Sequence, residues 1–109
     1  MAKQIKFKYD GKDYTLEFTR RSIETMEKQG FSMSNISDRP MSALPQLFSG
    51  AFMAHHKFEK QEVKDKIFAG LRNREELFST LVDMYNEPIV ALMSEPDDDE
   101  GNVEWTTEG

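Results

Sequence analysis

The sequence predicts an α+β domain in which a β-hairpin precedes about four α-helices. Apolar residues alternate with polar ones over residues 4–18, and they recur at helical spacing in four later segments. The length of 109 residues suits one domain with a modest core. We expect this domain to span residues 1–95 and an acidic tail to follow it over residues 96–109.

The hairpin carries apolar side chains at every second position: Ile5, Phe7 and Tyr9, then Tyr14, Leu16 and Phe18. Asp10-Gly11 favours a two-residue turn, and a four-residue loop over residues 10–13 is the alternative. The two registers differ by two residues, so both keep the apolar side chains on one face. An isolated hairpin is marginal in water, and this face should therefore pack on helices or join other strands.

Three shorter helices are predicted next, over Arg20–Gln29, Ser42–Lys57 and Glu62–Leu71. Thr19 is placed to cap the first helix. Gly30 should end that helix in the left-handed conformation, with Phe31 folding back in a Schellman arrangement. Residues 32–40 are expected to form a loop.

The longest apolar stripe lies in Asn73–Met93, which is predicted to be one helix at the centre of the core. Asn73 is a good N-cap residue, and Glu76 three residues later would complete a capping box. Leu81 is expected to be buried. The full stripe consists of Leu77, Phe78, Leu81, Met84, Tyr85, Ile89, Leu92 and Met93.

The net charge of −6 is unevenly distributed. Residues 1–93 hold all 14 Lys and Arg together with 13 of the 20 acids, while residues 94–109 hold seven acids and no base. A near-neutral domain with an acidic tail argues against nucleic acid as the main partner, because phosphate binding needs a basic face. The tail is charged and poor in apolar residues, so it is predicted to be disordered.

No motif predicts an enzyme, a metal site or a cofactor. The chain has no cysteine, no Gly-x-Ser-x-Gly elbow and no phosphate-binding loop. His55, His56 and Glu59 do not share one helix face, and a zinc site needs three or four convergent ligands. No apolar run approaches the roughly 18 residues that span a membrane, and no signal-peptide pattern opens the chain. We therefore expect an intracellular soluble protein.

The Phe and Met stripes allow two interpretations. Aromatic and Met side chains suit a surface that accepts varied apolar helices, and the candidates for partner binding are Phe48, Phe52, Met84 and Tyr85. The alternative is that all four side chains are buried core.

Three stretches in order carry a family resemblance: YTLEFTRRSIETMEKQGF at 14–31, LFSGAFMAHHK at 47–57 and ELFSTLVDMYNEPIVALM at 76–93. With the hairpin and the acidic end, they resemble the small tail assembly chaperones of long-tailed (siphovirus-type) phages and of Gram-positive prophages. The similarity covers roughly residues 5–95.

This resemblance implies a protein of the host bacterial cytoplasm that binds the phage tape measure protein. Such a chaperone keeps that long helical chain soluble and helps the tail-tube subunits of the major tail protein assemble around it. The family fixes no binding residues by a motif, and a homo-oligomer is compatible with it. The rival interpretation is a non-enzymatic structural or regulatory phage protein, such as a head–tail or tail component.

Overall fold

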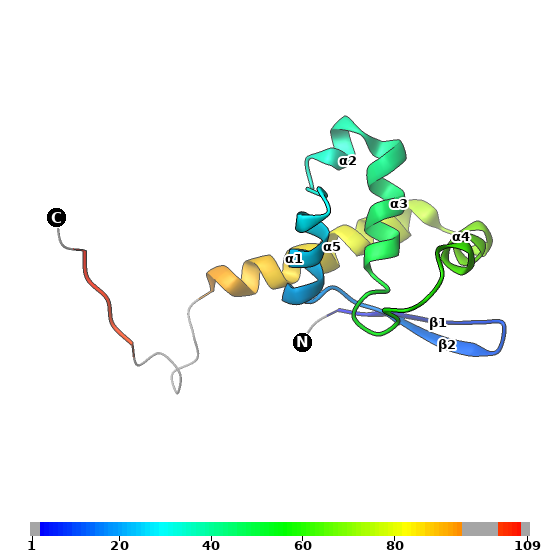
Figure 1. The fold of residues 1–109 in the computed structure, drawn as a ribbon, viewed down its shortest axis with the longest axis horizontal. Coiled ribbons are helices and arrows are strands. Elements are labelled where there is room, and N and C mark those ends of the chain that lie inside the picture. Colours follow the sequence, from blue (N-terminus) through cyan, green and yellow to red (C-terminus); the bar gives the residue numbers. More distant parts are fainter. Residues whose placement is uncertain (1–2, 95–102, 108–109) are drawn as a thin grey trace.

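Two strands form a hairpin, and five helices follow it in the described part of the chain (Figure 1). The computed structural model describes residues 3–94 and 103–107. The elements are β1 (Ile5–Tyr9), β2 (Lys12–Leu16), α1 (Arg20–Lys28), α2 (Asn35–Asp38), α3 (Pro40–Gly50), α4 (Gln61–Gly70) and α5 (Arg74–Met93). This order confirms the predicted α+β class.

The hairpin has the two-residue turn. Asp10 and Gly11 both adopt positive φ, 50° and 76°, as the tight turn between twisted strands requires. Phe7 therefore pairs with Tyr14 and Ile5 with Leu16. Tyr14 and Leu16 are buried, so β2 is the strand that rests on the helices.

The ends of α1 follow the predicted local signals. Thr19 accepts a hydrogen bond from the Ser22 backbone N–H, and the Ser22 hydroxyl accepts one from the Thr19 N–H, which completes a capping box. Gly30 adopts φ 94°, and the Phe31 N–H donates to the Met26 carbonyl. With the Gly30 N–H donating to the Glu27 carbonyl, this is the expected Schellman arrangement.

The segment between α1 and α4 differs from the prediction in two places. The expected loop over residues 32–40 contains the short helix α2, and α3 begins at Pro40 and ends at Gly50 rather than at Lys57. After Gly50 the N–H groups of Phe52 and Met53 donate to carbonyls three residues back, so tight turns replace the α-helix. This turn segment also accepts a hydrogen bond from the end of the hairpin, because the Glu17 N–H donates to the Ala51 carbonyl at 3.0 Å.

The start of α5 is capped differently from the prediction. Asn73 has φ 54° and ψ 49° and makes no side-chain cap, so the expected capping box with Glu76 is wrong. Asparagine tolerates this left-handed conformation, which turns the chain sharply between α4 and α5. Arg74 closes the end of α4: its guanidinium donates to the Phe68 and Ala69 carbonyls and lies 4.4 Å over the Phe68 ring.

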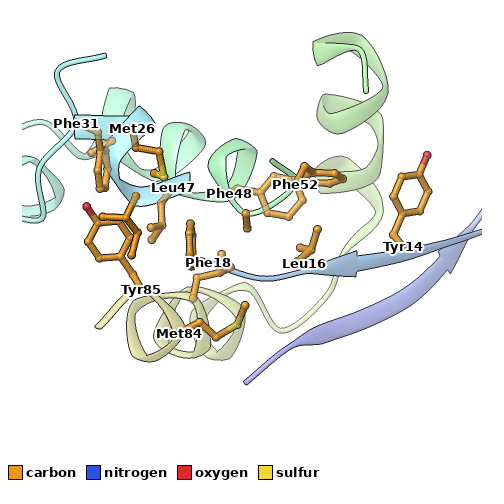
Figure 2. Close-up of a cluster of buried hydrophobic side chains, with 14 of the residues drawn as sticks. Tyr14, Leu16, Phe18, Met26, Phe31, Leu47, Phe48, Phe52, Met84 and Tyr85 are labelled. Carbon is orange, nitrogen blue, oxygen red and sulfur yellow. The ribbon is translucent and has the colours of Figure 1, made fainter. Parts of the chain in front are cut away.

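The core lies where α5 passes α1 and α3 and meets the end of β2 (Figures 1 and 2). Tyr85 packs edge-on against Phe18 and Phe31, with ring centroids 5.3 and 5.5 Å away. Leu81 is fully buried, as expected. The predicted tail, residues 96–109, falls largely outside the described residues; residues 103–107 are exposed and form neither helix nor strand.

Candidate functional site

The four candidate partner-binding residues lie in the core. Phe48, Phe52, Met84 and Tyr85 are between 0% and 3% exposed, and Figure 2 shows them among the buried side chains. A partner cannot reach them without opening the domain. The assignment of these residues to a partner surface is therefore corrected in favour of the alternative, core packing. The physical reason is that α1, α3 and α5 pack against one another, and that the Phe52 ring lies against the Phe48 and Tyr14 rings.

The exposed apolar surface lies instead at the C-terminal end of α5. Val90 is 62% exposed, Leu92 59% and Met93 82%. Together with Ile89 they form what we call the helix-end patch: Ile89, Val90, Leu92 and Met93. In Figure 1 these last turns of α5 extend past α1, so the rest of the described chain does not cover them.

Within residues 3–94, the charged residues next to the helix-end patch precede it in the sequence. The segment from Pro88 to Ser94 carries no charged residue, whereas Glu87 directly precedes it and Asp83 lies one turn before Glu87. Lys3 contacts both acids. Its backbone N–H donates a hydrogen bond to the Glu87 carboxylate at 2.7 Å, and its side-chain Nζ lies 3.9 Å from the Asp83 carboxylate. A shallow groove lined by Asp83, Asn86, Glu87, Pro88, Val90, Ala91 and Ser94 follows this side of α5. The patch is thus an apolar helix end with an acidic border.

A smaller apolar groove lies between α3, α4 and α5. Its volume is about 330 Å³, and Phe48, Phe68 and Phe78 supply its aromatic walls. Met41 also lines this groove, and its side chain is 90% exposed. Three helices contribute residues to this groove, whereas the helix-end patch lies on one helix and presents its apolar side chains at helical spacing.

The residues considered for a metal site form hydrogen bonds and ion pairs with the hairpin and with the residue Glu17 that follows it. His56 Nε2 accepts a hydrogen bond from the Thr15 N–H at 3.0 Å. Glu59 accepts one from the Tyr14 hydroxyl and pairs with Lys12, and His55 pairs with Glu17 at 2.6 Å. The hydrogen bond to Glu59, together with burial, raises the pKa of Tyr14 to about 12. In residues 3–94 and 103–107, no cluster of three or more His, Cys, Asp or Glu side chains could hold a metal ion.

Stability should fall as the pH falls below the ordinary histidine value, because of His56. Burial, and then the charges of Lys12 and His55, lower the pKa of His56 from 6.5, so the folded state favours the neutral ring. The contribution of neutral His56 to the free energy of unfolding is fully present above pH 6.5. It is lost as the pH falls through the folded-state pKa of His56, by up to about 1.4 kcal/mol per pH unit. Chemical denaturation from about pH 7.5 to about pH 5.5 measures this slope.

The matched variant for this measurement is His56→Gln. Its amide oxygen can accept the Thr15 N–H but does not titrate, so the slope should flatten in this interval. The Glu17 carboxyl does not interfere, because its hydrogen bond with His55 lowers its pKa below 4.5. An unchanged slope in His56→Gln would assign the pH dependence to another group.

Comparison with known proteins places the whole chain in one family. The protein-family model described as Domain of unknown function (DUF5055) matches residues 1–109, so the chain belongs to this family. No curated protein and no solved structure matches the chain. No helix in the described ranges is long and apolar enough to cross a membrane.

Proposed function

We propose that this member of the DUF5055 family is a phage tail assembly chaperone that binds the tape measure protein through the helix-end patch. It acts in the cytoplasm of the host bacterium, where it keeps the tape measure protein soluble while tail-tube subunits assemble around it. The observation that carries the proposal is the exposed, uncharged end of α5, with Val90, Leu92 and Met93 each more than half exposed.

The geometry of the patch suits an amphipathic helix as its partner. Ile89, Leu92 and Met93 follow the i, i+3, i+4 spacing of one helix face, and Val90 widens that face. Burying such side chains against a second apolar stripe is favourable by roughly 1.5–3 kcal/mol for each side chain that becomes fully buried. The partner helix should carry basic residues beside its apolar stripe, facing Asp83 and Glu87.

The resemblance to tail assembly chaperones implies that the partner is the tape measure protein. The tape measure protein is a long helical chain whose apolar faces are unpaired until the tube forms, and a small domain with one exposed helix end can cover such a face reversibly. Direct contact with the major tail protein would add a second step to this role.

The double substitution Val90→Gln/Leu92→Gln tests the patch. Both side chains are exposed and glutamine is a good helix former, so the melting temperature should stay within a few degrees of the wild type. Suppression of tape measure aggregation during co-expression should be lost, because the apolar contact area is removed. Soluble tape measure protein is measured by centrifugation and blotting.

The matched control is Phe58→Gln, which removes another apolar side chain, 90% exposed, far from α5 in the sequence. This variant should keep full activity. Aggregation suppressed equally by all three proteins would place the binding surface elsewhere. Mass spectrometry of purified particles addresses the role itself: a chaperone is absent from finished virions, and stoichiometric recovery would indicate a structural tail component.

A further inference from the structure

A third hollow, in addition to the two grooves described above, lies between α1, α3 and the start of α4. Its volume is about 490 Å³, within the range of ligand pockets. Pro45 and Met53 supply accessible apolar surface, whereas Met26 and Phe31 are almost fully buried, and Lys57 and Lys64 supply positive charge. None of the described residues that line this cavity is acidic. We call it the lysine cavity.

The two lysines lack carboxylate partners within the described ranges. Lys64 Nζ donates to the Ser49 hydroxyl at 3.1 Å and lies 5.6 Å over the Phe52 ring, while Lys57 Nζ lies 5.7 Å over the Phe58 ring. Among residues 3–94 and 103–107, neither ammonium is within 4.0 Å of an acid. A carboxylate entering the cavity would therefore be attracted.

The chain itself contains a segment of the complementary chemistry. Trp105 is 82% exposed and Val103 84% exposed, and Glu104 lies between them. The surrounding residues 94–109 carry seven acids and no base. An apolar pair interrupted by an acid, within a strongly acidic stretch, complements a cavity that combines apolar surface with two lysines.

The chain is long enough to return to the cavity. Phe31 lines the cavity, and its ring lies 5.5 Å from the Tyr85 ring. Ser94 is nine residues beyond Tyr85, or about 13–14 Å along the helix axis. Trp105 is eleven residues beyond Ser94, and eleven extended residues span up to about 36–40 Å. The tether therefore exceeds the path back along α5.

We propose that the lysine cavity binds the chain's own segment Val103–Trp105, with Trp105 against Pro45 and Met53 and Glu104 against Lys57 and Lys64. Figure 1 shows residues 103–107 beyond the end of α5, so the docked state is a second arrangement of the same chain. Salt should weaken it, because its charge pairs lie near the surface.

The test uses the fluorescence of Trp105, which is the single tryptophan of the chain. In the full-length protein at low concentration and low salt, acrylamide quenching should be several-fold weaker than in the free peptide 103–107. Glu104→Lys should restore quenching to the level of the peptide, and it cannot unfold the domain core. High salt should have the same effect in the wild type.

Paired lysine variants identify the binding site. Lys57→Gln/Lys64→Gln should expose Trp105, while Lys60→Gln/Lys66→Gln, the same charge change on exposed lysines outside the cavity, should leave it protected. Circular dichroism checks that each variant is folded. Quenching equal to the peptide in the wild type would overturn the proposal. Protection that appears only as protein concentration rises, with dimers in sedimentation velocity, would assign the segment to a second copy and overturn intramolecular docking.

Discussion

Phe52→Gln is expected to unfold the domain at room temperature or to leave it only marginally folded. Phe52 is fully buried, and its ring contacts Phe48 and Tyr14 at centroid distances of 5.2 and 5.9 Å. Losing a buried phenylalanine costs about 3–5 kcal/mol, and burying an unpaired amide adds about 1–3 kcal/mol. This sum approaches the whole stability of a small domain, which is roughly 5–15 kcal/mol.

The measurement is thermal unfolding followed by far-UV circular dichroism. Phe58→Gln serves as the control, because Phe58 lies six residues along the same connection and is 90% exposed. It should melt like the wild type. A folded Phe52→Gln protein that had lost only partner binding would return Phe52 to the partner surface and contradict the burial described above.

Local signals account for the parts of the fold that could be predicted. Asp10-Gly11 provides the positive φ values of a tight turn, and Thr19 and Gly30 set the ends of α1 through bonds to residues within five positions. Such signals need no knowledge of the rest of the chain. They predicted the hairpin, the capped first helix and the order of the longer helices.

The parts that could not be predicted depend on distant residues. Asn73 was expected to cap α5, but the sharp turn from α4 requires its left-handed conformation. The helix after Pro40 stops at Gly50, and the following turn places His56 to accept the Thr15 N–H, 41 residues earlier. The apolar periodicity of residues 42–57 gives no indication of that hydrogen bond.

The candidate site was misplaced for the same reason. A stripe at helical spacing shows that a helix has an apolar face, but it does not show which part of that face the fold covers. On α5 the covered part contains Leu81, Met84 and Tyr85, and the uncovered part contains Leu92 and Met93. The lengths of the helices in the structure explain the division: the twenty residues of α5 extend about 30 Å, longer than the nine- to eleven-residue helices α1, α3 and α4 that could cover them.

The same substitution at two places on α5 separates the covered part from the uncovered part. Leu81→Ala should lower the free energy of unfolding by about 2–4 kcal/mol, because Leu81 is fully buried and its removal leaves a cavity beside α3 and α1. Leu92→Ala should change it by less than about 0.5 kcal/mol, because that side chain is 59% exposed. Urea denaturation of both variants measures the difference. A loss of about 2–4 kcal/mol in both variants would mean that the end of α5 is covered in solution, by the chain itself or by a second copy, and a loss at Leu92 that grows with protein concentration would indicate the second copy. No loss in either variant would place the core away from Leu81.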